Sequence, residues 1–297
     1  MNAKNSGAGR AADRSRGGDK PGAKPEAAVE ILIDGLYKAL DGKPVLTGVD
    51  LAVRRGDVLA IVGGSGCGKT VLINHVLGQL TPDKGRVLVT DHALADRPLV
   101  DLALVDADRL DRIHMHWGVV FQRNALFSGT VFDNIALWLR EVKDLDDAAI
   151  EKVARRVLKA VDLPATDEFL AQPTEGLSGG MAKRLAVARA LSMDPATLFY
   201  DEPTTGLDPT SAAHVHDLIA ATHAEARPGR PPRTTIIITH DKDLLQRLEP
   251  RIVLLNEGRV SFDGSLGEFE ASSSPVIRPY FELMPSLHER PMPIVAT

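Results

Sequence analysis

The sequence predicts an α/β fold in which a mostly parallel core sheet is joined to an antiparallel β subdomain and a helical subdomain. Three observations lead to this prediction. The short apolar run Val58–Val62 is followed by a glycine-rich loop and a helix, as expected of a strand buried in a parallel sheet. Two later apolar runs, Thr197–Tyr200 and Thr234–Thr239, also end in polar residues. Between these runs, residues 123–176 carry mostly helical periodicity.

Composition is that of an ordinary globular protein. The 297 residues are 44% hydrophobic and 25% charged, and the net charge of −5 disfavours a nucleic-acid partner. A single cysteine excludes a disulfide framework and fits a reducing cytosol. No apolar run reaches the roughly 20 residues that span a bilayer, and the first residues lack the apolar core of a secretory signal. If the protein works at a membrane, we expect other chains to supply the spans.

Composition also divides the chain. We expect residues 1–29, rich in Gly, Ala, Lys and Arg, to be a disordered N-terminal tail. Residues 30–270 form one domain, with the helical subdomain at about 123–190. Residues 271–297 form a C-terminal extension, whose prolines exclude a regular domain but whose apolar residues are expected to pack on the body or on a partner.

The remaining elements follow from local patterns. Short β-rich segments at Ile31–Ile33, Val45–Leu46 and Val49–Val53 predict a small antiparallel sheet, with a turn at Asp41–Gly42. Residues 91–116 are acidic and irregular, with partly helical spacing. Periodicity and turn residues predict the other elements: a helix from Lys69 to Leu80, a strand at Arg86–Thr90, a strand at Trp117–Phe121, an amphipathic helix around Ile150–Val161, a helix from Met181 to Met193, a helix beginning near Pro209, and a hairpin of Ile252–Leu255 with Arg259–Phe262.

The loop after Val58–Val62 has the pattern G-x-x-x-x-G-K-[ST], which predicts a nucleoside-phosphate site. Its glycines allow backbone N–H groups to converge on phosphate oxygens, and the following helix directs its positive end at the same point. Lys69 can reach the β- and γ-phosphates, and the Thr70 hydroxyl can ligate Mg²⁺. Cys67 is interpreted as a small loop residue, with a redox switch as the alternative. The predicted phosphate-binding residues are Gly63, Gly64, Ser65, Gly66, Cys67, Gly68, Lys69 and Thr70.

Two carboxylates follow the apolar run Thr197–Tyr200. Asp201 lies at the carboxyl end of that strand, where it can hold Mg²⁺. Glu202 is placed to polarise a water molecule for attack on the γ-phosphate. The alternative for Glu202 is an ordinary surface residue at a strand end.

The segment Leu177–Met181 reads LSGGM, and here the chain resembles the ATP-binding cassette (ABC) ATPases, P-loop NTPases whose signature is LSGG followed by glutamine or another residue. Taken alone, Ser178 reads as an ordinary helix N-cap. The resemblance implies more: two cassettes pair head to tail, and Ser178, Gly179 and Gly180 of one copy reach the γ-phosphate held by the other.

Further positions match this family in order and spacing. The resemblance implies that Gln122 contacts Mg²⁺ and the helical subdomain, that Asp208 lies at the dimer interface, and that His240 hydrogen-bonds the γ-phosphate. The family's usual adenine-stacking aromatic position is occupied by Leu40 here, so Tyr37, three residues earlier, is the candidate for that contact. The resemblance thus implies an ATPase that uses ATP and Mg²⁺, with catalytic residues Glu202, His240 and Lys69 and metal ligands Thr70, Gln122 and Asp201.

A second resemblance is finer. Five segments are similar to those of the Mla/MCE-associated phospholipid transport ATPases. They are Phe121–Ser128, Thr130–Ile135, Leu139–Glu141, Lys183-Arg184 after the signature, and Tyr200–Pro209. This implies a homodimer that serves integral-membrane permease subunits and an MCE-type lipid-binding protein at the cytoplasmic face of the inner membrane. The alternatives are the ATPase of a small-solute importer and a soluble ABC ATPase without a transport role.

Overall fold

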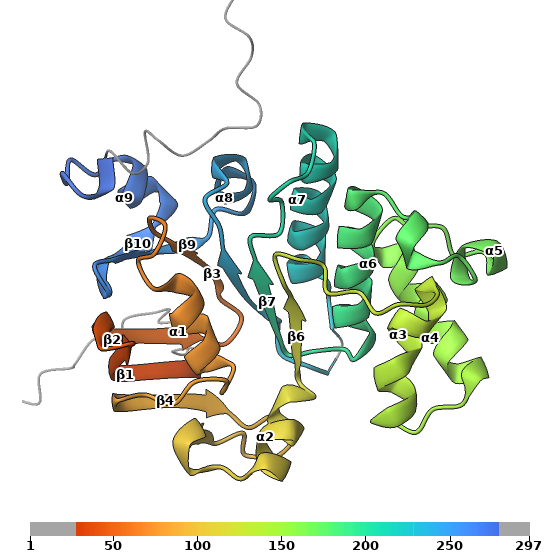
Figure 1. The fold of residues 1–297 in the computed structure, drawn as a ribbon, viewed down its shortest axis with the longest axis horizontal. Helices are drawn as coiled ribbons and strands as arrows, with labels where there is room; N and C mark the ends of the chain where they lie inside the picture. Colours follow the sequence, from red (N-terminus) through yellow and green to blue (C-terminus); the bar gives the residue numbers. More distant parts are fainter. Residues whose placement is uncertain (1–27, 228, 279–297) are drawn as a thin grey trace, which may run out of the picture.

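A computed structural model describes residues 28–227 and 229–278 and contains two β-sheets flanked by helices (Figure 1). The N-terminal tail predicted for residues 1–29 lies, up to residue 27, outside the described residues, as does the C-terminal extension after residue 278. The elements are β1 (Val29–Leu40), β2 (Lys43–Arg54), β3 (Val58–Val62), α1 (Lys69–Val76), β4 (Lys84–Thr90), β5 (Leu99–Asp101), η1 (Leu102–Leu104), α2 (Ala107–His114), β6 (Trp117–Val120), α3 (Val131–Glu141), α4 (Asp147–Ala160), α5 (Asp167–Leu170), η2 (Thr174–Gly176), α6 (Gly179–Ser192), β7 (Thr197–Asp201), α7 (Pro209–Ala224), β8 (Thr234–Ile238), α8 (Lys242–Leu248), β9 (Arg251–Asn256), β10 (Arg259–Ser265) and α9 (Leu266–Glu270).

The core sheet has the strand order β10-β9-β3-β8-β7-β6. All neighbours from β9 to β6 are parallel, and only the edge pair β9–β10 is antiparallel. β3, β7 and β8 are buried along almost their whole length because helices or the second sheet cover both faces, which explains their continuous apolar sequences. The predicted mostly parallel core is therefore confirmed.

The second sheet is antiparallel, with the order β2-β1-β4-β5. The turn at Asp41–Gly42 is confirmed, but the prediction of three short segments was wrong, because β1 and β2 form one long hairpin. Irregular register, for example between Ile33 and Leu36, shifts the buried face along the hairpin. These bulges interrupt the alternation on which the sequence prediction depended.

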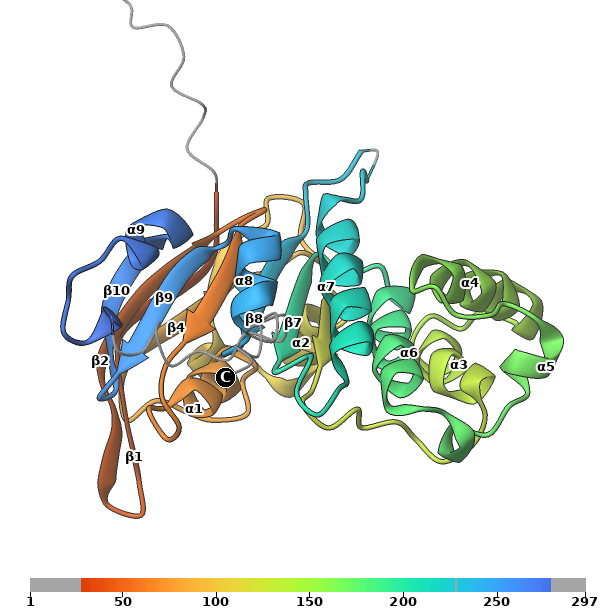
Figure 2. The ribbon, with the colours of Figure 1, turned by 90° about the horizontal axis from the view of Figure 1, so that it is seen from above.

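Helices α3 to α6 form a smaller lobe, beside the core sheet in Figure 1 and projecting from it in Figure 2. The expectation that residues 123–176 are mostly helical was wrong for residues 123–130, which form no helix. The buried Asn134 of α3 holds this segment instead. Its side chain accepts from the backbone N–H of Phe127 at 2.8 Å and donates to the carbonyls of Phe127 and Thr130 at 3.0 Å.

Helix α1 is shorter than predicted. It ends at Val76, with Leu77 as its C-cap and the left-handed residue Gly78 beyond, whereas apolar spacing alone extended it to Leu80. Residues 91–116 contain β5, η1 and α2, so their partly helical spacing reflects one real helix. Among the described residues, no helix combines the length and apolarity needed to cross a membrane.

Candidate nucleotide site

The predicted chemical residues lie at the carboxyl ends of neighbouring parallel strands. The glycine loop predicted to bind phosphate follows β3, His240 follows β8, Asp201 ends β7, and Gln122 lies just after β6. These strands are adjacent in the order β3-β8-β7-β6. Because parallel strands end at one edge of a sheet, residues up to 177 positions apart in the sequence meet along one line.

The glycine loop is shaped by close packing at its two ends. A Cβ at Gly63 would lie 2.4 Å from the backbone oxygen of Leu255, and Gly68, with φ of 105°, would direct a Cβ at 2.8 Å from Leu46. A side chain at Gly63 would therefore collide with the backbone, and the positive φ at Gly68 disfavours any residue with a Cβ. Gly64, Ser65 and Gly66 are exposed, and the half-buried Cys67 packs against the core.

Lys69 and Thr70 begin α1 directly after this loop. Gly68 occupies the N-cap position, and no side chain of the described residues caps the helix. Its first N–H groups therefore point at the loop, where they can bind an anion. The Lys69 ammonium donates to the carbonyls of Gly63 at 2.7 Å and Gly64 at 3.0 Å, so it lies over the loop. Thr70, in the first turn of the helix, is exposed.

Asp201 and Glu202 are both partly buried. Burial, together with the neighbouring charge of Glu202, raises the pKa of Asp201, while the charges of Lys69 and Lys183 lower it. Glu202 is a non-glycine residue in the left-handed region, with φ of 47°, and its side chain is 14% exposed. Its carboxylate contacts His240 Nδ1 at 2.8 Å and accepts from the Thr205 hydroxyl at 3.3 Å.

His240 is half exposed and is oriented by Glu202. The hydrogen bond that His240 donates to Glu202 raises the pKa of His240, burial opposes this shift, and the charges of Glu202 and Asp241 favour it. The charge of Lys69 lowers the same pKa. The phosphate loop, the paired carboxylates and the histidine are therefore electrostatically coupled in one place.

Two supporting residues were missed in the sequence. The buried Asp241 accepts from the Thr204 hydroxyl at 2.7 Å and lies 2.8 Å from His216 Nε2, so it joins the turn after β7 to α7 and to the loop of His240. The buried Lys183 donates to the carbonyls of Phe121 at 3.1 Å and Gln122 at 2.8 Å. The available signals were the position of Asp241 beside His240 and that of Lys183 just after the signature, but neither indicated these contacts, and nothing local marks His216.

The signature residues do not join this cluster. Ser178 caps α6 and accepts from the N–H of Met181, Gly179 is exposed, and the buried Gly180 packs against Ser211. Figures 1 and 2 both place β7 and α7 between α1 and α6. The phosphate loop and the signature helix of one chain are thus on opposite sides of the core.

The other two candidates lie at the margins. Asp208 is exposed and caps α7 by accepting from the N–H of Ser211 at 3.0 Å. The ring of Tyr37 packs over Gly48, and the Lys84 ammonium lies 6.0 Å from its centroid. Tyr37 and Leu40 are both about 40% exposed on β1, with values of 42% and 38%.

Comparison with known proteins agrees with this geometry. Residues 46–205, more than half of the chain, match the family described as ABC transporter. The chain is 33% identical over 265 residues to the chloroplastic protein TRIGALACTOSYLDIACYLGLYCEROL 3 of Arabidopsis thaliana, covering 84% of this chain and 73% of that protein. It is 34% identical over 232 residues to the methionine import ATP-binding protein MetN of Caulobacter vibrioides, where it spans 77% of this chain and only 64% of the relative.

Solved structures resemble the fold closely. CbiO1 of Clostridium perfringens, described as part of the ABC transporter complex CbiONQ, has a TM-score of 0.70 and 30% identity, covering 82% of this chain and 92% of that one. The ATP-binding cassette MJ0796, solved as a dimer bound to ADP and Pi, has a TM-score of 0.67 and 26% identity over 80% and 98% of the two chains. The chain therefore belongs to the ABC transporter family, as an ATP-hydrolysing ATP-binding subunit.

Proposed function

We propose that two copies of this chain bind two ATP molecules at a shared interface and hydrolyse them with residues from both copies. The observation that carries this proposal is the alignment of the four polar loops at the ends of β3, β8, β7 and β6, with the signature helix α6 on the far side of the core. Ser178 has no phosphate loop of its own chain beside it. A second copy, turned head to tail, would bring Ser178 to the γ-phosphate, and Asp208 would lie at that interface. MJ0796, a relative of similar fold, is a dimer.

In this proposal each residue of the cluster has one role. Lys69 and the N–H groups of the loop hold the β- and γ-phosphates, and His240 donates to the γ-phosphate. Glu202 accepts a proton from the attacking water, which requires its carboxylate to leave His240. Tyr37 is the aromatic candidate for the adenine, and it would have to leave Gly48 to stack on the base.

The oxygen donors of the site fit Mg²⁺. Thr70 offers a hydroxyl, Asp201 a carboxylate and Gln122 an amide oxygen, and Mg²⁺ prefers such oxygen ligands. Mg²⁺ prefers few protein ligands and completes its shell with water and phosphate. When bound, it neutralises the charge that develops on the phosphates.

Glu202→Gln tests the catalytic assignment. The amide cannot accept the proton, so we expect ATP turnover to fall by about 10²–10⁴-fold while ATP binding and an ATP-dependent dimer persist. Turnover is measured by phosphate release and the dimer by light scattering. Glu249→Gln is the matched control, because Glu249 also has a left-handed backbone, with φ of 45°, but is exposed and lies outside the nucleotide cluster. Normal turnover in Glu202→Gln would contradict the assignment.

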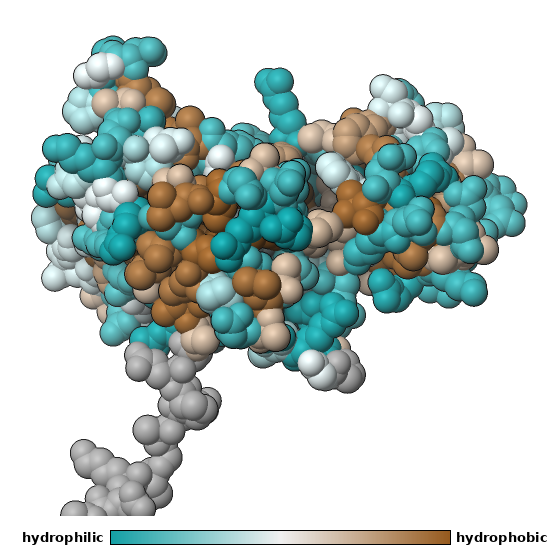
Figure 3. Space-filling model, turned by 90° about the horizontal axis from the view of Figure 1, so that it is seen from below, coloured by the Kyte–Doolittle hydropathy of each residue, from teal (hydrophilic) through white to brown (hydrophobic). Residues whose placement is uncertain are grey.

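We further propose that the dimer drives a permease through the groove between the two lobes. This groove has a volume of about 670 Å³, and its aromatic lining includes Trp117, Phe121, Phe127 and Trp138. In Figure 3 hydrophobic residues gather on the larger lobe, and a second group borders the hollow beside the smaller lobe. Phe127 and Trp138 line this groove together and are 42% and 49% exposed, and exposed apolar side chains that gather in one place are typical of interaction sites. A short amphipathic helix of the permease is the proposed occupant.

Trp138→Asp tests this docking. We expect recovery of the chain with membranes to fall severalfold while its ATP binding is unchanged, because Trp138 lies outside the nucleotide cluster. Leu104→Asp is the control, since Leu104 is 84% exposed but does not line the groove. Equal losses in both variants would show a general effect of charge and would refute the docking site.

The proposed cargo is phospholipid or another hydrophobic molecule, moved across or between envelope membranes together with an MCE-type lipid-binding protein, with the chain bound at the cytoplasmic face of the inner membrane. The support is the sequence resemblance described above and the lipid name carried by the Arabidopsis relative. A methionine importer is the second candidate, favoured by the name of the Caulobacter relative.

Purification of the native complex separates these functions. Co-purified phospholipid with permease and lipid-binding subunits, identified by mass spectrometry, would support lipid transport. A substrate-binding protein without lipid would favour the importer. A single soluble species without membrane partners would refute both and leave an ABC ATPase with no transport role.

A further inference from the structure

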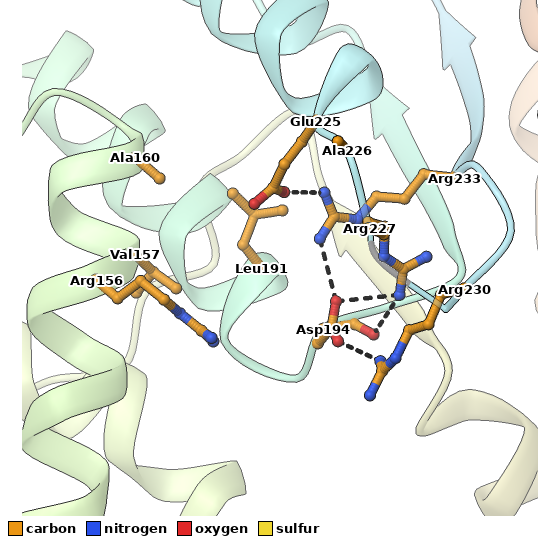
Figure 4. A pocket seen from close by; sticks show the side chains of 10 residues that line it. All are labelled: Arg156, Val157, Ala160, Leu191, Asp194, Glu225, Ala226, Arg227, Arg230 and Arg233. Atoms are coloured by element: carbon orange, nitrogen blue, oxygen red, sulfur yellow. Dashed lines mark hydrogen bonds and ion pairs between the residues drawn. The ribbon is translucent and has the colours of Figure 1, made fainter.

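A second cavity lies away from the nucleotide cluster, between the two lobes near the end of α6. It has a volume of about 230 Å³ and is bordered by α4, by the residues after α6 and by the loop after α7 (Figure 4). Four arginines and two carboxylates line it, an excess of two positive charges: Arg156, Arg227, Arg230, Arg233, Asp194 and Glu225.

One carboxylate is shared by three of these arginines. Asp194 accepts from Arg227 at 3.0 Å and from Arg233 at 3.2 Å, and Arg230 also donates to it. Burial would raise the pKa of Asp194, but the charges of Arg227 and Arg230 prevail and hold it below its ordinary value. Arg233 completes its shell with Glu225 and the carbonyls of Thr222 and Pro195, so its role is structural.

Arg227 is less well satisfied. Its side chain is only 6% exposed, yet its Nε has no hydrogen-bond partner among the described residues. A buried guanidinium N–H without an acceptor is costly. Burial also lowers the pKa of Arg227, in spite of the charge of Asp194. An additional anion in the cavity would offset this burial of a positive charge.

Arg156 approaches from the opposite wall. It extends from α4 toward the loop of Asp194 in Figure 4, and within residues 28–227 and 229–278 no hydrogen bond or ion pair is formed by it. The C-terminal ends of α6 and α7 also face this region and offset part of the positive charge, by about half a unit for each helix. Lys143, which donates to the Met193 carbonyl at 3.1 Å, adds a further positive charge beside the cavity. A positive excess therefore remains.

We propose that this cavity is a binding site for a phosphate group, held by Arg156, Arg227 and Arg230. Guanidinium groups on two sides suit the several oxygens and the double charge of a phosphate. The cavity is smaller than the roughly 300–1000 Å³ of pockets that enclose drug-sized ligands, so the part of the ligand inside it is a phosphate group and little more. Two sources share this chemistry, free inorganic phosphate and the monoester headgroup of phosphatidate at a membrane surface.

The site is tested on the full chain saturated with a non-hydrolysable Mg-ATP analogue, so that the phosphate loop is already occupied. Inorganic phosphate is titrated in by calorimetry, and we expect one further site per chain. Arg227→Lys keeps the charge but removes the planar guanidinium with its several donors, and Arg156→Gln removes the charge from the opposite side of the cavity. Each should weaken phosphate binding by about tenfold or more. Lys152→Gln, which removes a positive charge one turn earlier on α4 and outside the cavity, should leave it unchanged.

A second arm identifies the source. The chain is floated with phosphatidylcholine vesicles that contain or lack phosphatidate. Recruitment that needs phosphatidate and is lost in Arg156→Gln but not in Lys152→Gln assigns the site to a headgroup, and calorimetric binding without recruitment assigns it to free phosphate. Absence of both signals, or equal losses in Arg156→Gln and Lys152→Gln, would overturn the proposal.

Discussion

Glu202 and His240 show how single residues shape the proposed nucleotide site. Glu202 adopts a left-handed backbone conformation, which costs a β-carbon-bearing residue on the order of 1–3 kcal/mol and persists where the surroundings impose it. Here its N–H donates to the Ile238 carbonyl at 2.9 Å, so β8 fixes the turn in which Glu202 lies. The carboxylate is thereby directed at His240, on the loop that follows the same strand.

This contact predicts a pH dependence. The Glu202 carboxylate raises the pKa of His240 above its usual 6.5 in the folded state. The stabilisation from the pair is therefore fully present below the unfolded pKa and is lost as the pH rises through the higher folded pKa. An NMR titration of His240 is expected to give a pKa above 6.5 in the native chain and a lower one in Glu202→Gln. Glu249→Gln should leave the value unchanged, and an unaltered pKa in Glu202→Gln would contradict the pair.

Lys183 connects α6, the helix that begins at the signature, to the loop after β6 that carries Gln122. It lies on α6, which begins at the signature, and its ammonium bonds the carbonyls of Phe121 and Gln122 after β6. Burial lowers the pKa of Lys183, while the charge of Asp201 raises it. The smaller lobe is thus attached to the loop of Gln122 by one buried cation.

We predict that Lys183→Met loosens this attachment. The methionine retains most of the apolar volume but leaves two carbonyls without their charged donor, so the free energy of unfolding should fall by about 1–3 kcal/mol. Hydrogen exchange at residues 121–123 should accelerate, and ATP turnover should fall severalfold. Lys152→Met, at an exposed position of α4, should change none of these, and unchanged exchange in Lys183→Met would contradict the prediction.

Across the whole molecule, the two sheets and the C-terminal segment form one body around β3. Arg251 of β9 donates to the Ala52 carbonyl of β2 at 2.8 Å and pairs with Asp263 of β10 at 2.6 Å, so it joins the antiparallel sheet to the core sheet. On the other side, Ile277 packs in a cluster with Phe269, Leu266 and the β3 residues Ala60 and Val62. The segment after α9, up to residue 278, therefore packs against β3, the strand that leads into the glycine loop.

This packing predicts a stability difference between neighbouring residues. Ile277 is 4% exposed, so Ile277→Ala should lower the free energy of unfolding by about 2–4 kcal/mol in urea titrations. Val276 is 41% exposed, and Val276→Ala should change it by less than about 0.5 kcal/mol. Similar effects of the two substitutions would show that this segment does not pack on β3.

The sequence alone determined the strands and loops whose signals are local. A few consecutive residues are enough to mark the strand Val58–Val62 with its glycine loop, the carboxylates at the end of β7 and the histidine after β8. That such strands end at one edge of the sheet follows from the general geometry of parallel sheets. The order of the motifs, compared with a known family, then gave the nucleotide chemistry.

Only the tertiary structure decided which side chains meet across the chain. The contact of Asp241 with His216 joins residues 25 positions apart, and the bond of Lys183 to Phe121 joins residues 62 positions apart. The arginine cavity around Asp194 gathers residues from several elements. The geometry of all three depends on how the helices pack on the sheet. The long β1–β2 hairpin and the early end of α1 were also decided there, because bulges and a left-handed glycine override apolar periodicity. Local patterns specify what a segment can form, whereas packing specifies which groups it must face.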